Sequence, residues 1–356
     1  MNLQQAKRYA RTILLSRGPE FVDIELTNRC NLHCAACWFH GELGVGDRYG
    51  HAEMTTDQVL RLIDQIAPYH PTVYLGGGEP LMRKDLPAII EYASRSGLPV
   101  SLTTNGTLVD AQAARAFVEL GVNSIRVSID GPEEVHDTLR GPGVFSRAIA
   151  NLHQLAKYKR QTGSDRPHVS VNLLITPLVM ADLEAAIEQV RAVVGEDVEY
   201  LVLHHPWFVT PAELASHQTE VKRALGRAAA GAQAHCLRWG DSIDAKALSE
   251  KIARLEGRPG VRFFPDLHGD AVERFYVEGH SPRTVCTMPF RGVVVKPNGD
   301  VMFCPDEWID DYVLGNVLQK PLDEIWNGRT ARRFRWVLLR KGPFPGCKRC
   351  SWMYRI

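Results

Sequence analysis

A predominant charge is missing from this 356-residue chain, because 42 lysines and arginines face 41 aspartates and glutamates. Such a balance offers neither the basic surface typical of nucleic-acid binding nor an acidic tail, so we expect no nucleic-acid partner. No apolar run reaches the roughly 20 residues of a membrane span. The first residues also lack a signal-peptide hydrophobic region and cleavage site. We therefore expect a cytoplasmic protein with no membrane partner.

A disulfide framework is a poor explanation for the eight cysteines, because seven of them fall into two groups in an otherwise ordinary chain. The first group, Cys30, Cys34 and Cys37, lies in the run TNRCNLHCAACW. Three thiolates hold a four-iron cluster but leave one iron without a protein ligand. Zinc is the alternative, although a structural zinc site normally has four protein ligands. The spacing therefore indicates a cluster whose open iron binds something else.

The second group, Cys286, Cys304, Cys347 and Cys350, supplies four thiolates and can close a cluster. Cys286 and Cys304 flank the segment VVVKPNGDVMFC, where Asn298, Gly299 and Asp300 are a hairpin signal. A structural zinc knuckle is the alternative for these four residues.

Short β-branched runs alternate with helical patterns in the first half of the chain, which is typical of parallel βαβ units. The predicted strands are residues 21 to 27, 72 to 77, 100 to 105, 124 to 130, 169 to 175 and 198 to 205, and the predicted helices between them are 54 to 67, 85 to 97, 110 to 121 and 148 to 160. This order predicts either an open doubly wound sheet or a barrel. In both folds the chemistry lies at the carboxyl ends of the strands.

The alternation stops after residue 206. Residues 207 to 282 have mainly helical patterns, so we interpret them as a connector or lid. The hairpin signal then opens a third section, and the predicted domains are residues 1 to 206, 207 to 282 and 283 to 356.

The run LGGGEP follows the second predicted strand and ends in Gly77, Gly78, Glu79 and Pro80. Glycines let a backbone approach a ligand closely, and the Glu79 carboxylate can accept from an amine. These residues predict a site for a zwitterion.

The first cysteine group with Trp38 behind it, together with the LGGGEP run, resembles the radical S-adenosylmethionine (radical SAM) superfamily. Residues 103 to 109 and 124 to 152 resemble its later strands, so the resemblance covers about residues 20 to 205. It implies an α/β fold, a partial (β/α)6 barrel of the TIM type. It also implies that SAM chelates the open iron of a [4Fe-4S] cluster, and that the reduced cluster cleaves SAM to a 5'-deoxyadenosyl radical, which removes a hydrogen atom from the substrate.

The resemblance also implies residues that contact SAM. Glu79 and its glycines receive the methionine amine, while Ser128 and Arg140 contact the ribose or the carboxylate. Arg140 suits a carboxylate because its guanidinium can pair bidentately. Asn105, at the end of the third predicted strand, either lines the SAM pocket or makes the turn.

Two histidines, His204 and His205, end the sixth predicted strand, where catalytic residues of such folds lie. Alternation sends only one of them inward. We take both as catalytic candidates, with satisfied packing in a loop as the alternative.

The second cysteine group and the segment 314 to 328 resemble the C-terminal extension called Twitch, a shortened SPASM domain. This resemblance implies one auxiliary [4Fe-4S] cluster in addition to the SAM-binding one. A cluster with four protein ligands suits electron transfer to or from a substrate radical.

Together these features predict a radical SAM oxidoreductase acting on a polar small molecule such as a sugar, cyclitol or nucleoside, with a reductant such as flavodoxin or ferredoxin. One alternative is a maturase that modifies a ribosomally made precursor peptide. An alternative of another class is an iron-sulfur protein that only transfers electrons.

Overall fold

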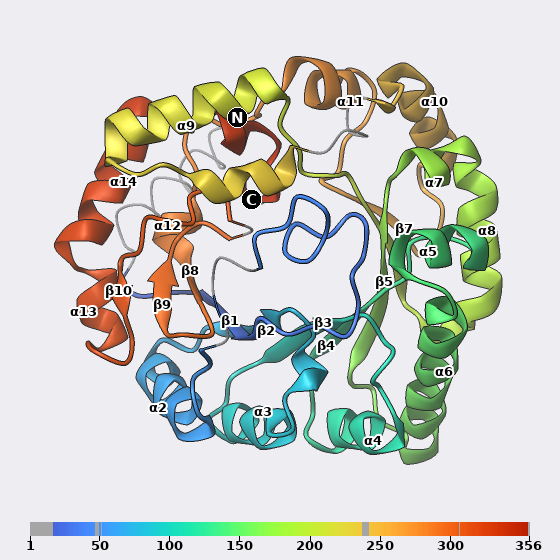
Figure 1. The fold of residues 1–356 in the computed structure, drawn as a ribbon. Helices are drawn as coiled ribbons and strands as arrows, with labels where there is room; N and C mark the ends of the chain where they lie inside the picture. Colours follow the sequence, from blue (N-terminus) through green and yellow to red (C-terminus); the bar gives the residue numbers. More distant parts are fainter. Residues whose placement is uncertain (1–16, 47–49, 51, 237–241, 306, 355–356) are drawn as a thin grey trace.

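The computed structural model describes residues 17–46, 50, 52–236, 242–305 and 307–354. Within these residues the strands form one ten-stranded sheet in the order β10-β9-β8-β1-β2-β3-β4-β5-β6-β7. The neighbours from β8 to β7 are parallel, whereas β9 pairs antiparallel with both β8 and β10. Figure 1 shows helices surrounding the curved sheet, with the segment that follows β1 lying across the middle of the ring. The predicted partial barrel is therefore confirmed.

The strands are β1 (Phe21–Thr27), β2 (Thr72–Gly77), β3 (Val100–Thr104), β4 (Ser124–Ser128), β5 (His168–Leu174), β6 (Tyr200–His204), β7 (Val261–Phe264), β8 (Gly292–Val295), β9 (Asp300–Met302) and β10 (Gly315–Asn316). The helices are α2 (Thr56–Ile66), α3 (Leu86–Arg95), α4 (Ala111–Glu119), α5 (Glu133–Arg140), α6 (Val144–Thr162), α7 (Pro177–Ala181), α8 (Leu183–Val194), α9 (Pro211–Leu225), α10 (Ala245–Leu255), α11 (Asp270–Glu273), α12 (Met288–Arg291), α13 (Leu322–Trp326) and α14 (Arg329–Lys341). In the part of the chain that the structure covers, none of these helices has the length and apolar character needed to cross a membrane.

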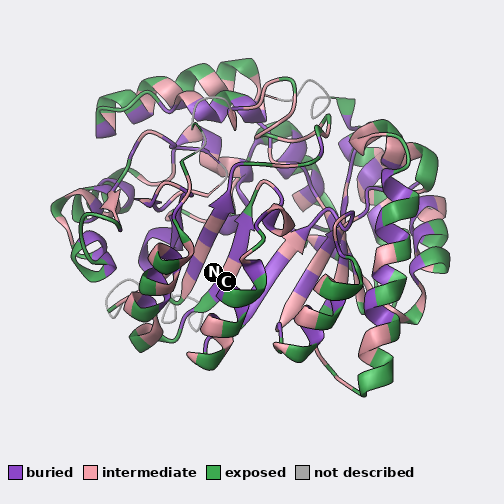
Figure 2. Cartoon of the chain, turned by 60° about the horizontal axis from the view of Figure 1, so that its bottom comes forward, coloured by how far each residue is buried: buried purple, intermediate pink, exposed green. Residues whose placement is uncertain are grey.

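Local sequence explains much of this arrangement. In β1, Val22 and Ile24 are fully buried, while Asp23 and Glu25 between them point to the opposite face because side chains alternate along a strand. The aliphatic faces of the strands pack against the helices, whose outer sides are exposed (Figure 2). Helix α2 begins at a capping box, in which the Thr55 side chain accepts from the Gln58 amide and the Gln58 side chain accepts from the Thr55 amide.

All six strands predicted from the alternation are present, and the bounds of β1 and β2 are as predicted. The region interpreted as a helical connector also contains a strand, β7, which extends the sheet beside β6. The hairpin predicted around Asn298 to Asp300 is β8 and β9.

The C-terminal section is joined to the barrel by backbone hydrogen bonds. Strand β8 lies parallel to β1, with Phe21 opposite Gly292 and Ile24 opposite Val295. The second cysteine group is therefore attached to the strand that leads into the first. The predicted domain boundaries themselves stay a prediction.

Candidate active site

The first cysteine group lies in the loop that leaves the carboxyl end of β1, where nitrogen donors surround the sulfur atoms. The Cys37 Sγ accepts from the amides of Phe39 and His40 at 3.4 and 3.3 Å. Arg140 Nη1 lies 3.8 Å from the Cys34 Sγ. Burial raises the pKa of the Cys30 thiol to about 11, so a thiolate at this position needs such donors or a metal ion to stabilise it.

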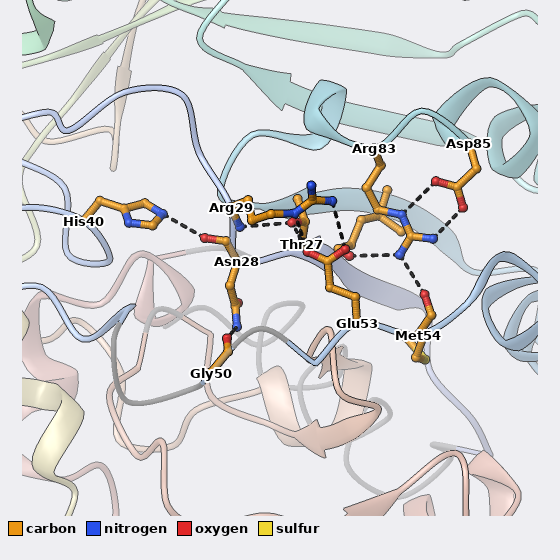
Figure 3. A network of polar contacts seen from close by, with 10 residues as sticks. Thr27, Asn28, Arg29, His40, Gly50, Glu53, Met54, Arg83 and Asp85 are labelled. Carbon is orange, nitrogen blue, oxygen red and sulfur yellow. Dashed lines mark hydrogen bonds and ion pairs between the residues drawn. The ribbon is translucent and has the colours of Figure 1, made fainter.

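A polar network fixes the entrance to this loop (Figure 3). The Glu53 carboxylate accepts from the Thr27 hydroxyl and from Arg29 Nε and Nη2, the latter two at 3.0 and 3.1 Å. Thr27 Oγ1 in turn accepts from the Arg29 amide at 3.0 Å. His40 Nε2 lies 2.9 Å from the Asn28 carbonyl oxygen, which ties the far end of the cysteine loop back to its start.

The glycines of the LGGGEP run hold β2 against the start of this loop. A Cβ atom on Gly77 would lie 2.3 Å from the Thr27 carbonyl oxygen, and one on Gly78 would lie 2.2 Å from the Arg29 carbonyl oxygen. The Gly78 and Glu79 amides donate to these same two oxygens at 2.8 and 2.9 Å. The close approach predicted for a ligand is thus made, in this structure, by the chain's own backbone.

Glu79 is buried beside the first cysteine group, with 1% of its surface exposed. Its carboxylate accepts from the Thr104 hydroxyl and the Asn105 amide, both at 2.8 Å, and from the Leu81 amide at 3.2 Å. Burial raises the pKa of this carboxyl group, although these three donors oppose the shift. A carboxylate has about four lone-pair directions, so one acceptor direction remains for the predicted amine. Pro80, also buried, starts the short turn that follows.

Asn105 makes a turn and also supports the cysteine loop. Its Oδ1 accepts from the Thr107 amide at 2.9 Å, and its Nδ2 donates to Asn31 Oδ1 at 2.9 Å. The same Nδ2 lies 4.0 Å from the Cys30 Sγ. Asn105 therefore makes the turn, and its contact with SAM stays a prediction.

Ser128 and Arg140 lie on the same side of the barrel as the first cysteine group. Ser128 ends β4 and is paired in register with Asn172 of β5. The Oδ1 of Asn172 is buried and has no hydrogen-bond partner in the described structure, which suits an atom that accepts from a ligand. Arg140 Nε donates to Asp130 Oδ2 at 2.6 Å, and this pair orients the guanidinium toward Cys34.

The two histidine candidates differ sharply. His204 shares the half-buried face of β6 with Tyr200 and Val202, opposite the buried leucines of that strand. His205 points the other way and is 1% exposed, with Nδ1 2.8 Å from the Tyr276 hydroxyl. Burial lowers its pKa to about 3, so the ring stays neutral. The His205 ring is therefore enclosed by packing, whereas His204 lies on the half-buried face of the strand, and the catalytic assignment of the two histidines stays a prediction.

The second cysteine group lines a single cavity. Cys286, Cys304, Cys347 and Cys350 all line this small cavity, with apolar side chains between them. Burial raises the pKa of Cys286 to about 11 and that of Cys347 to about 12. Four cysteines that line one apolar cavity supply the ligand number of an iron-sulfur cluster and equally that of a structural zinc site.

Two sets of contacts join segments that lie next to the two cysteine groups in the sequence. In the first, Trp38, one residue past Cys37, stacks on His235 with ring centroids 6.1 Å apart. His235 stacks on Trp308 at 4.1 Å, with the ring planes 10° apart. Trp308 lines the cavity of the second group. Three aromatic rings thus extend from the first cysteine loop to the second centre.

The second set of contacts is a buried charge cluster, which we call the Glu25–Lys296–Glu307 cluster. Lys296, 4% exposed, donates to both oxygens of Glu25 at 2.9 and 2.8 Å and also pairs with Glu307. Burial raises the pKa of Glu25, and the charge on Glu307 adds to this shift while Lys296 opposes it. One cation between two carboxylates leaves an excess negative charge that a proton can neutralise.

Comparison with known families agrees with this geometry. The profile of the Radical SAM superfamily matches residues 24–190, and that of the SPASM iron-sulfur cluster-binding domain matches residues 286–351. The chain belongs to the radical SAM superfamily and carries a SPASM-type C-terminal domain. Its cofactors are accordingly SAM and iron-sulfur clusters: Cys30, Cys34 and Cys37 fit the SAM-binding cluster, and the second group fits an auxiliary one.

Among particular proteins, the chain is 32% identical over 215 residues to an AdoMet-dependent heme synthase of Methanosarcina barkeri, a match that covers 60% of this chain and 57% of the relative. It is 32% identical over 134 residues to the mycofactocin maturase MftC of Mycobacterium ulcerans, covering 37% of this chain and 35% of the relative. The matches thus span between about one third and somewhat over half of these relatives. The structure of Streptococcus suis SuiB bound to S-adenosylmethionine superposes with a TM-score of 0.63 at 15% identity, over 98% of this chain and 72% of SuiB. At that identity the likeness concerns the fold.

Several site residues were not predicted from the sequence. Asn172 had a detectable signal, because it is a polar residue on the half-buried face of an otherwise aliphatic strand. Glu25 had a similar one in β1. Lys296 and His235 had none, since their roles depend on contacts between segments far apart in the chain.

Proposed function

We propose that this protein removes a hydrogen atom from its substrate by SAM-dependent radical chemistry and oxidises the resulting substrate radical through the second cysteine centre. The observation that carries this proposal is the stack of Trp38, His235 and Trp308, which extends from the first cysteine loop to the cavity of the second group. When bound, SAM and the first cluster supply the 5'-deoxyadenosyl radical, and the second cluster supplies a one-electron acceptor.

The residues of the chain would bind, orient and accept a proton. Glu79 has an acceptor direction left for the methionine amine, and Asn172 Oδ1 can accept from a hydroxyl of the ribose or the substrate. The oxidation removes one hydrogen atom, one electron and one proton from the substrate. Glu25, in which burial raises the pKa, lies on the barrel side of β1 and is the proposed proton acceptor.

For the substrate, we propose a precursor peptide. Two considerations favour it over the sugar, cyclitol or nucleoside predicted from the sequence. The barrel side of the strands carries charged groups of both signs, Asp23, Arg126 and the Glu25–Lys296–Glu307 cluster, which can bind the ionised groups of a peptide. A mycofactocin maturase is also among the relatives. A heme precursor is the second candidate, because a relative with more extensive similarity is a heme synthase.

The experiment starts from protein reconstituted anaerobically with iron and sulfide, which should hold about eight irons per chain if both centres carry [4Fe-4S] clusters. With dithionite and SAM it should release 5'-deoxyadenosine slowly. Peptides encoded beside the gene and iron-coproporphyrin III are then added in separate reactions. If a peptide is the substrate, we expect its addition to speed 5'-deoxyadenosine release and to give a peptide product that has lost two hydrogens. Stimulation by the porphyrin alone would favour the second candidate, and no release under any condition would contradict the enzyme assignment.

A further inference from the structure

Helix α14 (Arg329–Lys341) is the most basic element of this nearly neutral chain. Its sequence RTARRFRWVLLRK spans 13 residues, of which six are arginine or lysine and none is acidic. The chain as a whole has a net charge of only +1. Positive charge is therefore concentrated on one helix, which lies at the edge of the molecule beside α13 and α9 (Figure 1).

The exposed side of α14 surrounds a tryptophan with arginines. Trp336 has 58% of its surface exposed, which is unusual for this residue type, and Leu339 has 44%. Three exposed arginines lie three or four positions from Trp336 and therefore share its face of the helix. They are Arg332, Arg333 and Arg340. The Arg340 guanidinium carbon lies 5.2 Å from the centre of the Trp336 ring. We call these five residues the α14 patch.

The opposite side of the same helix faces the second cysteine centre. Phe334 and Leu338 are buried and line the cavity together with the four cysteines. A helix with its side chains is about 10–12 Å across. The α14 patch therefore lies about one helix diameter from the wall of the auxiliary-cluster cavity.

More positive charge borders the end of the helix. An open hollow at the surface is lined by Arg283, Lys341 and Lys348, with Glu278 as the acidic member. Lys341 also pairs with Glu220 on α9. Lys348 lies directly between the cavity cysteines Cys347 and Cys350 in the sequence.

We infer that the α14 patch is the docking site of an acidic one-electron carrier protein that exchanges electrons with the auxiliary cluster. Arginine and tryptophan are the residues most enriched where protein interfaces gain their affinity, and clustered positive charge selects and steers an acidic partner. The inference rests on the proposed function in one respect, that the second centre carries electrons. Beyond that function, it identifies the surface at which these electrons leave the protein.

The electron transfer balances without forming or breaking a bond. A cluster held by Cys286, Cys304, Cys347 and Cys350 would supply the one electron that it gains from the substrate radical. An oxidised carrier docked on the α14 patch would accept that electron and so be reduced by one electron. No proton moves between the two proteins in this step.

The test measures the binding of oxidised flavodoxin, as the acidic probe, to the reconstituted holoenzyme at about 0.02 M and about 0.3 M salt, because screening within a few ångströms at high salt weakens contacts between charges. Three proteins are compared. They are the wild type, Arg332→Glu/Arg340→Glu in the patch, and Arg147→Glu/Lys157→Glu on α6, which makes the same change in net charge with exposed residues of a helix on the other side of the ring.

We expect wild-type binding that weakens with salt, a loss of at least about tenfold at low salt in the patch variant, and no loss in the α6 variant. Trp336→Ala, which changes an exposed side chain, should weaken binding at both salt concentrations. Equal binding by the patch variant and the wild type would overturn the inference. So would binding of the patch to phosphatidylglycerol vesicles with none to flavodoxin, which would assign the surface to an anionic membrane.

A second readout separates this inference from the proposed function. Release of 5'-deoxyadenosine with dithionite should be unchanged in the patch variant, because dithionite needs no docking site. In stopped flow, the appearance of one-electron-reduced flavodoxin after mixing with dithionite-free reduced enzyme should slow about tenfold. If SAM is not cleaved by any of the proteins, the proposed function fails while the binding result still decides whether the patch is a docking site.

Discussion

Substitution of Gly78 by alanine should detach the first cysteine loop from β2. The added Cβ would lie 2.2 Å from the Arg29 carbonyl oxygen and 2.7 Å from its carbon, so this backbone must move by about 1 Å. The same carbonyl accepts from the Glu79 amide at 2.9 Å. Overpacking of this kind destabilises a fold by about 1–3 kcal/mol. Because Cys30 is the next residue, the displacement also moves a cluster ligand.

Two other glycines provide the comparison. Gly97 has φ +74° and open space around its Cβ position, so Gly97→Ala introduces backbone strain alone, about 1 kcal/mol. Gly77 has φ +115° and a Cβ position 2.3 Å from the Thr27 carbonyl oxygen, so Gly77→Ala introduces both effects, about 2–5 kcal/mol. The expected order of destabilisation is therefore Gly97→Ala, then Gly78→Ala, then Gly77→Ala.

Two assays distinguish a general loss of stability from damage to the site. Urea unfolding followed by circular dichroism gives the free energy of unfolding, and iron analysis with electron paramagnetic resonance reports each cluster. We expect Gly97→Ala to keep its full iron content, whereas Gly78→Ala and Gly77→Ala should lose the SAM-binding cluster, keep the auxiliary one and release at least about tenfold less 5'-deoxyadenosine. The reasoning is refuted if Gly78→Ala unfolds like Gly97→Ala and retains its SAM-binding cluster.

Three further outcomes follow from the site. Cys347→Ala/Cys350→Ala should still release 5'-deoxyadenosine but form no product, and product at the wild-type rate would show that the second centre carries no electrons. Glu25→Gln should keep the fold, because Lys296 retains one carboxylate, yet slow product formation about tenfold or more relative to 5'-deoxyadenosine release. Equal slowing of both would exclude a proton-accepting role. Because burial lowers the pKa of His205 from 6.5 to about 3, its contribution to stability is complete above pH 6.5 and is lost as the pH falls toward 3. His205→Gln should flatten this part of the curve of unfolding free energy against pH, and an unchanged slope would contradict the neutral buried ring.

The elements that sequence patterns predicted are those whose signals are local. The alternation in β1 and the capping residues of α2 lie within a few positions of one another, so their placement depends little on the rest of the chain. Strand β7 has only four residues between Gly260 and Pro265 in a mainly helical region. Its strand character comes from pairing with β6, which no local pattern reveals.

In the site, too, residues with local sequence signals were predicted and residues brought together only by the fold were not. The seven cysteines were identifiable because spacing and thiolate chemistry define cluster ligands. The ion pair between Glu25 and Lys296 joins residues 271 positions apart, so only the fold brings them together. For His205, the place at a strand end suggested catalysis, whereas the direction in which the ring points depends on packing around Tyr276, which lies 71 positions away in the sequence.

Because β8 pairs with β1, the C-terminal section also protects a strand that would otherwise lie at the open edge of the sheet. Without β8, the row of N–H and C=O groups along Phe21 to Ile24 would face solvent beside the fully buried side chains of Val22 and Ile24. Such an unpaired aliphatic edge is a template for pairing with other chains. Shortened forms of this protein that end after residue 282 should therefore aggregate through β1, whether or not they can still bind SAM.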